Sequence, residues 1–438
     1  MKFLEEKFVP IAAKIGSQKH LVAIRDGFVV VMPATIAGAI AVLVNNIHLL
    51  FGETGLNMPA IGDGFKSFID STGISAVCNM VNNGSINMMA ILVAPMIAMN
   101  LAKANNGDEK ATAIVTLAAY IAPMAVTSDA AGAIGAKGTA YLSQTLFKAD
   151  GLFVAMICAL FIGEVFPRLS KLDALKITMP DGVPPAVSNT FSSLVPAMIG
   201  VFVWPIICNI VLSVSGESMW VLINNIVGAP LKSISQSVFT LILIYFMIDF
   251  LWIFGLHGAN VVGSITTPVL TPLSLENVET FAAGGEPQNT VVGEVQSGFA
   301  FLGGSGATIG LIIAIFIFSK SKAARTVASI SVAPGIFEIN EPLTFGLPIV
   351  MNVVYAIPFI LGPIILGTIT YFLMEGGMLR RPCIQAPWVT PPILIGFLCT
   401  GGDIRGAIWN VIEIVILVVL WTPFVMMNDR IEARNAED

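Results

Sequence analysis

Long apolar runs constrain this chain more than any other feature of its sequence. Several approach or exceed the ~20 residues that a helix needs to cross the hydrocarbon core of a bilayer. Charged residues make up only 11% of the 438 residues, whereas soluble domains carry about 25%. The pattern predicts an all-α polytopic membrane protein. The nine clear apolar runs are 28–51, 86–102, 111–127, 151–166, 187–214, 238–254, 307–318, 347–374 and 407–427.

The distribution of Lys and Arg predicts the orientation, because short basic loops stay on the cytoplasmic side. The basic N-terminus, the loop 168–176 and the segment SKSKAAR at 319–325 should all be cytoplasmic. Nine crossings in sequence order place 319–325 outside, so one more crossing is required before it. Only 259–273 offers apolar residues for that crossing. We therefore predict about ten transmembrane helices with both termini cytoplasmic, which leaves Arg380 and Arg381 outside.

Some stretches near the apolar runs are too polar or too rich in glycine and proline to span. Parts of 275–308 and the stretch GIFEINEPLTFG at 335–346 are the two examples. Irregular backbone at membrane depth is tolerated where protein or a watery cavity surrounds it. We predict two re-entrant hairpins there. The first twenty residues and 216–236 have the pattern of amphipathic surface helices.

The two halves of the chain differ in character. Residues 1–215 hold five ordinary helices, whereas 216–438 hold nearly all the broken intramembrane sequence. Broken segments of this kind mark the substrate site in transporters. We therefore expect a scaffold half followed by a substrate-binding half.

His257 follows an apolar run, with Trp252 just before it and Asp249 one turn earlier. An ionisable group within a membrane costs about 3 kcal/mol on insertion scales, which favours a functional role for His257. The alternative is a histidine at a helix end that reaches the headgroups or caps a carbonyl. Asp249 is interpreted as a structural residue of the bundle interior.

Glu338 and Glu341 stand three residues apart, with Asn340 between them and Pro342 directly after. The proline and the flanking glycines indicate a turn-rich hairpin. In the functional interpretation, the carboxylates accept hydrogen bonds from substrate hydroxyls. In the alternative, they lie at the aqueous edge and cap helix starts.

Two further motifs are candidates for a binding site. The loop GGSGAT, 303–308, contains Ser305 and Thr308, and its glycines allow a ligand or another helix to approach closely. Trp388 lies in the proline-rich stretch APWVTPP, where an indole either stacks on a sugar ring or anchors the chain at the membrane interface.

This mixture of carboxylate, imidazole, indole and hydroxyl groups suits a neutral polyhydroxylated ligand. Intramembrane arginines for an anion and a ligand set for a metal are both missing from the pattern. We predict no cofactor. The net charge of −6 argues weakly against nucleic-acid partners.

Four stretches together resemble the IIC membrane component of bacterial phosphoenolpyruvate-dependent sugar phosphotransferase systems, in the lactose, cellobiose and diacetylchitobiose branch. The resemblance covers essentially the whole chain and implies ten spans with two re-entrant hairpins. It also implies an N-terminal half, 1–215, that dimerises and a C-terminal half, 216–438, that binds sugar. The four stretches are FGLHGANVVGSITTPVLTP, FLGGSGATIGL, GIFEINEPLTFGLPIVMN and MPDGVPPAVSNTFSSLVPA.

The resemblance implies a permease in the bacterial cytoplasmic membrane. Its substrate is a disaccharide such as cellobiose, lactose or diacetylchitobiose. A separate IIB protein, itself supplied by IIA, transfers a phosphoryl group from its own cysteine to the C6 hydroxyl of the sugar. The chain is then the transport subunit of a phosphotransferase complex, and the donor residue lies on its partner. The competing class is a proton-coupled secondary sugar transporter.

The motif positions also imply roles for individual residues. Glu341 and His257 would lie near the C6 hydroxyl, and Trp252 and Trp388 would flank the sugar rings. Glu338 departs from the family pattern, in which an asparagine is frequent. The other residues assigned to substrate binding are Glu338, Asn340, Ser305 and Thr308.

A homodimer is expected through residues 1–215. Small residues favour close contact between helices in membranes. Those expected to be exposed for this contact are Gly38, Ala39, Ala197 and Gly200.

Overall fold

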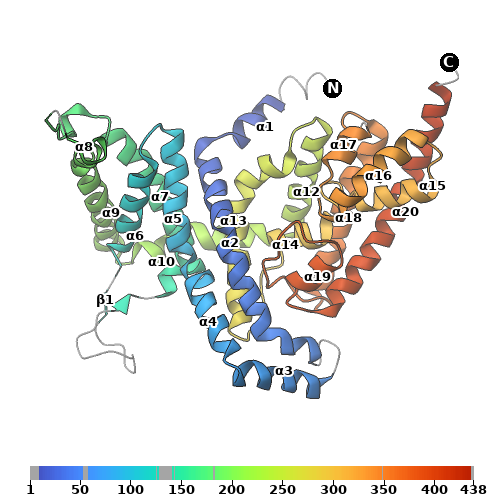
Figure 1. The fold of residues 1–438 in the computed structure, drawn as a ribbon, viewed down its shortest axis with the longest axis horizontal. Coiled ribbons are helices and arrows are strands. Elements are labelled where there is room, and N and C mark those ends of the chain that lie inside the picture. Colours follow the sequence, from blue (N-terminus) through green and yellow to red (C-terminus); the bar gives the residue numbers. More distant parts are fainter. Residues whose placement is uncertain are drawn as a thin grey trace. The chain divides into compact units, whose positions relative to one another are not determined.

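The structure, a computed structural model, describes residues 9–435 apart from 53–57, 125, 128–140, 143, 181–182 and 348. Regular structure in the described residues is helical except for two strands, β1 (Val126–Thr127) and β2 (Tyr141–Leu142), which pair antiparallel (Figure 1). The predicted all-α membrane fold is confirmed. Residues 1–8 of the expected N-terminal surface helix lie outside the described residues, and α1 (Val9–Gly16) forms its remainder.

The chain divides into two compact units, each built from separate stretches of sequence. Unit 1 consists of 1–17, 36–82 and 233–438, and unit 2 consists of 18–35 and 83–232. The expected division into a dimerising half, 1–215, and a sugar-binding half, 216–438, is a division by function, and it stays a prediction.

Unit 2 is a helical bundle whose core combines small and large apolar side chains. Its helix α5 (Met89–Ala104) packs against α6 (Glu109–Ile121) and α7 (Leu152–Leu169), and α9 (Leu194–Ser215) packs against α6. Ala94 and Ala98 of α5 are fully buried, which lets the helix axes approach closely. The other elements are the first part of α2 (Lys19–Asn46), η3 (Ile86–Met88), η4 (Gln144–Phe147), η5 (Ala149–Gly151), η6 (Asp173–Leu175), α8 (Pro185–Ser192), α10 (Met219–Ile223), the π-helix η7 (Asn224–Gly228) and the start of α11 (Ala229–Ser235).

The expected exposure of small residues is wrong in three cases. Gly38 and Ala39 are buried within the chain, and so is Gly200. A side chain at Gly200 would meet the Val115 side chain at 2.8 Å, so this glycine serves packing inside unit 2.

Unit 1 contains most of the broken sequence and a large apolar core. In that core α12 (Val238–Ile253) packs against α13 (Gly258–Ala282) and α18 (Val353–Glu375), while α20 (Ile404–Asn435) packs against α15 (Ile309–Phe318) and α18 (Figure 1). The other elements are the second part of α2, η2 (Ile47–Phe51), α3 (Pro59–Ser71), α4 (Ile74–Gly84), which ends just beyond this unit, α14 (Gly293–Val295), the π-helix η8 (Gln296–Ala300), α16 (Lys322–Ile336), α17 (Glu341–Gly346) and α19 (Leu394–Cys399).

Six helices in the described part of the chain are long and apolar enough to cross a membrane. A seventh candidate is the pair 219–235 and 238–253, whose two helices meet at 78°. The expected crossing at 259–273 forms part of α13, which continues unbroken through Pro268 and Pro272 for 25 residues. At 1.5 Å per residue this helix is about 37 Å long. The count of ten crossings and the two re-entrant hairpins stay predictions.

Candidate functional site

Unit 1 encloses a cavity of about 760 Å³ where several chain segments meet. Seven of the eight site residues predicted from the sequence line it. They are Trp252, His257, Ser305, Glu338, Asn340, Glu341 and Trp388. The cavity walls come from the end of α12, the start of α13, η8, the glycine loop (303–308), the turn before α17 and the loop before α19. The broken segments are therefore brought together, as the sequence predicted.

His257 and Glu341 face each other across this cavity. The distance from His257 Nε2 to Glu341 Oε1 is 3.9 Å, and both side chains are 44% exposed. This distance is too long for a direct hydrogen bond. An oxygen atom placed beside the pair can therefore contact both groups.

The local fold determines which nitrogen of His257 faces the cavity. His257 is the N-cap residue of α13, and its Nδ1 accepts a hydrogen bond from the Asn260 backbone N–H at 3.2 Å. A ring nitrogen that accepts carries no proton, so the proton of neutral His257 lies on Nε2. The group that points toward Glu341 is therefore a donor. The ring of His257 therefore caps a backbone N–H, where the alternative from the sequence had it cap a carbonyl, and it also lines the cavity; its functional role stays a prediction.

The two tryptophans occupy different environments. Trp252 is buried, and its ring lies 4.8 Å from that of His257 and 6.2 Å from that of Phe345. Its Nε1 finds no hydrogen-bond partner among the described residues. Trp388 is half exposed, so it offers a ring face to the cavity with little other packing to lose.

Glu338 connects the turn before α17 to the glycine loop. Its Oε2 accepts hydrogen bonds from the backbone N–H groups of Gly303 at 2.5 Å and Gly304 at 2.9 Å. Its Oε1 is buried and has no partner in the described part of the chain. Glu338 adopts a left-handed backbone conformation with φ +65°, which is uncommon for residues other than glycine. This conformation is consistent with a residue held in place by the contacts around it.

The glycine loop is also held from other sides. Asn340 Nδ2 donates to the Ser305 carbonyl at 2.5 Å, and Asp249 Oδ1 accepts from the Gly306 N–H at 3.0 Å. A side chain at Gly304 would meet Asn340 Cγ at 2.8 Å, so only glycine fits this approach. The assignment of Asp249 to the bundle interior agrees with its complete burial.

Thr308 is the one predicted site residue that does not line the cavity. It is fully buried, and its hydroxyl donates to the Gly303 carbonyl at 2.5 Å, which closes the glycine loop internally. The prediction that Thr308 contacts substrate derives no support from this position.

Sequence reasoning missed three polar residues of the cavity, Asn260, Gln296 and Ser297. Asn260 lies three residues after His257, on the first turn of α13, so helical spacing could have indicated it. Gln296 and Ser297 belong to the polar stretch 275–308, where no pattern distinguishes them from their neighbours.

Comparison with known proteins places the chain in a family. The family described as "Phosphotransferase system, EIIC" matches residues 25–363. The chain belongs to this family. The EIIC permease is 31% identical to the PTS system cellobiose-specific EIIC component of Lactococcus lactis over 98% of both chains. It is 34% identical to the lichenan permease IIC component of Bacillus subtilis, over 100% of this chain and 95% of the relative.

A solved structure is similar over the whole length of this EIIC permease. It is the crystal structure of the transporter ChbC, the IIC component from the N,N'-diacetylchitobiose-specific phosphotransferase system. The two share 31% identity with a TM-score of 0.89, and the similarity covers 99% of each chain. The resemblance seen in the sequence is thereby confirmed at the level of family and fold.

Proposed function

We propose that this EIIC permease binds a disaccharide of the cellobiose, lactose or diacetylchitobiose type in the cavity of unit 1. It translocates the sugar across the bacterial cytoplasmic membrane and presents the C6 hydroxyl to a separate phosphorylated IIB protein. IIA supplies IIB with the phosphoryl group. The names of the relatives support this range of sugars, with cellobiose the first to test.

The observation that carries the proposal is the arrangement of unused polar groups around the cavity. Trp252 Nε1 is a buried donor, and Glu338 Oε1 is a buried acceptor, each without a partner among the described residues. Burying such groups is unfavourable unless something pairs with them. Sugar hydroxyls both donate and accept, so one disaccharide satisfies both atoms while Trp388 packs on a ring face.

The His257–Glu341 pair gives the cavity its proposed chemistry. A sugar hydroxyl is a weak nucleophile at neutral pH, so a positioned base assists its attack on phosphorus. As the new P–O bond forms and the P–S bond of the IIB phosphocysteine breaks, the hydroxyl proton passes to Glu341. His257 Nε2–H donates a hydrogen bond to the same oxygen and holds it in place. The protein otherwise contributes position and charge.

Vesicle transport distinguishes this proposal from proton-coupled uptake. We expect cellobiose accumulation to require phosphoenolpyruvate, IIA and IIB, to deliver phosphorylated sugar, and to persist when an uncoupler dissipates the proton gradient. Accumulation of free cellobiose that an uncoupler abolishes, with no need for IIB, would identify a secondary transporter instead.

We also propose that the permease forms a homodimer through residues 1–215 and has both termini in the cytoplasm. The support comes from α9, where Phe202 and Ile206 are exposed apolar side chains on a helix with few buried positions. Native mass spectrometry in mild detergent is expected to show a dimer. A monomer at every concentration would refute the dimer.

A further inference from the structure

Unit 1 contains a second cavity, of about 600 Å³, which has a different lining and a different location. We propose that it is a low-affinity carbohydrate site on the outer side of the membrane. The disaccharide binds there before it reaches the cavity that holds His257 and Glu341, named the central cavity. The inference rests on the proposed function, because it takes the same sugar as its ligand.

The lining of this outer cavity suits a neutral polyhydroxylated ligand. Asn45, Asn46 and Asn79 supply carboxamides, which both donate and accept hydrogen bonds. Two basic side chains and two acidic ones balance each other in charge, which favours a neutral ligand over an ion. These four are Lys66, Arg380, Asp70 and Glu286.

Two side chains of the cavity lining each carry a polar atom without a partner among the described residues. Asn45 Nδ2 donates to Asn79 Oδ1 at 3.0 Å, but the buried Asn45 Oδ1 has no partner among the described residues. The buried Nδ1 of His48 likewise has none in the described part of the chain. Hydroxyl groups of a sugar can satisfy both atoms, since each hydroxyl can donate and accept.

Helix α13 relates this cavity to the central one. His257 and Asn260, at the start of the helix, line the central cavity, whereas Phe281 and Ala282, at its end, line the outer cavity. At about 37 Å this helix is as long as the hydrocarbon core of a bilayer is thick. In the predicted topology the end of α13 and Arg380 both lie outside the cell, which is the side from which the sugar arrives.

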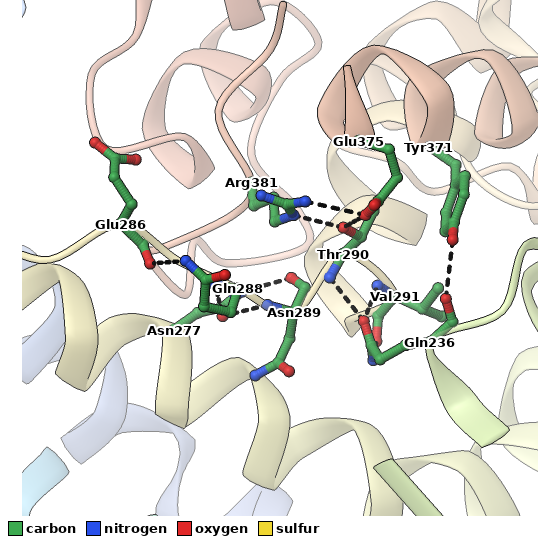
Figure 2. A network of polar contacts seen from close by, with 10 residues as sticks. All are labelled: Gln236, Asn277, Glu286, Gln288, Asn289, Thr290, Val291, Tyr371, Glu375 and Arg381. Carbon is green, nitrogen blue, oxygen red and sulfur yellow. Dashed lines mark hydrogen bonds and ion pairs between the residues drawn. The ribbon is translucent and has the colours of Figure 1, made fainter. Parts of the chain in front are cut away.

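A single extended segment borders both cavities. Residues 284–286 line the outer cavity and Gln296 and Ser297 line the central one, and the connection between them consists of 287–292 followed by α14. The side chains of Asn277 and Gln236 each accept hydrogen bonds from two consecutive backbone N–H groups of this connection (Figure 2). Residues 287–292, named the partition, are therefore held in a fixed position along the connection between the two linings.

The partition is also attached to the outer end of α18. Thr290 donates to Glu375, and Arg381 contacts both, with Nε 2.7 Å from Thr290 Oγ1 and Nη2 3.1 Å from Glu375 (Figure 2). The partition is therefore fixed to α13, to Gln236 and to the end of α18 by side-chain hydrogen bonds.

Equilibrium binding of radiolabelled cellobiose to the purified full-length permease tests the proposal. Wild type should show a tight phase and a weak phase. Glu341→Ala should lose the tight phase and keep the weak one, while the double variant Asn45→Ala/Asn79→Ala should lose only the weak phase. Retention of the tight phase by the double variant shows that it folds. Asn225→Ala, at an exposed position of η7, is the matched control and should behave as wild type.

Transport gives the second readout. The double variant should raise the KM for cellobiose uptake by about threefold or more and leave the maximal rate unchanged, because the central site is intact. The inference is overturned if wild type shows the tight phase alone, or if the weak phase persists when the double variant is combined with Glu341→Ala. An unchanged KM in the double variant also overturns it. Failure of the proposed function has a different signature, since Glu341→Ala would then leave the tight phase intact or wild type would bind no cellobiose.

Discussion

Asn277 offers a sharp test of how the partition between the two cavities is held. Its side chain is buried and uses its full hydrogen-bonding capacity. Oδ1 accepts from the N–H groups of Gln288 at 3.2 Å and Asn289 at 2.9 Å. Nδ2 donates to the carbonyls of Asn289 at 2.7 Å and Pro382 at 2.8 Å. Asn277→Ala removes all four bonds at once.

The expected loss of stability follows from where the four backbone groups lie. Asn289 and Pro382 are buried, so three groups are left without access to water, whereas Gln288 is exposed and its N–H can bind solvent. At about 1 kcal/mol for each bond, and more for a group left unsatisfied, we expect a loss of about 3–4 kcal/mol. The apparent Tm in detergent should fall by about 5 °C.

Two further variants define the result. Asn277→Asp keeps the acceptors, removes both donors and turns a carboxylate toward two carbonyls, so it should be at least as harmful as alanine. Gln288→Ala is the control, because that side chain is exposed and donates only to the Glu286 carbonyl. Thermal unfolding followed by intrinsic fluorescence measures all three. If Asn277→Ala unfolds within 1 °C of wild type, Asn277 does not hold the partition in the way described.

Three other predictions concern the central cavity and the topology. Trp388→Ala should weaken cellobiose binding by about fivefold, or ~1 kcal/mol, without lowering the Tm. Trp252→Ala should weaken binding and also lower the Tm, because its ring is buried against His257. Unchanged binding in both variants would make these residues membrane anchors. Glu338→Gln keeps an acceptor for the glycine loop but replaces the free charged oxygen with a neutral N–H donor, so binding titrations should show weaker cellobiose binding at an unchanged Tm. Equal affinity would exclude a carboxylate–hydroxyl hydrogen bond to the substrate. A cysteine at position 322 should resist membrane-impermeant reagents added outside intact cells, and labelling there would refute the ten-span topology.

Much of this architecture follows from sequence patterns with a simple physical basis. Apolar length predicts the membrane fold, and the mismatch between nine runs and the basic loops directs attention to 259–273, which forms part of one long helix. Ionisable and aromatic side chains in broken segments predict the cavity, because such groups are too costly at membrane depth to be placed without purpose. His257, Glu341 and Trp388 were found in this way.

The remaining features depend on contacts between distant residues. Thr308 carries a hydroxyl of the kind that binds sugars, but this hydroxyl donates to the Gly303 carbonyl within the glycine loop. Gly200 has the small size that favours contact with a helix of a second protomer, yet the Val115 side chain of the same unit already occupies the space beside it. The tautomer of His257 depends on the start of α13, and the two-sided use of Glu338 depends on a left-handed turn. Local patterns carry no signal for any of these contacts.

Phosphorylation of bound sugar by Glu341→Gln tests the central claim most directly. Glutamine keeps the shape of the side chain and most of its hydrogen bonding, but it cannot accept the hydroxyl proton. Cellobiose binding and IIB-dependent phosphorylation should be measured together, in vesicles supplied with phosphoenolpyruvate, IIA and IIB. We predict measurable binding with phosphorylation reduced by about 100-fold or more. Phosphorylation at the wild-type rate would contradict the account and leave Glu341 as the first residue of a short helix with no part in the chemistry.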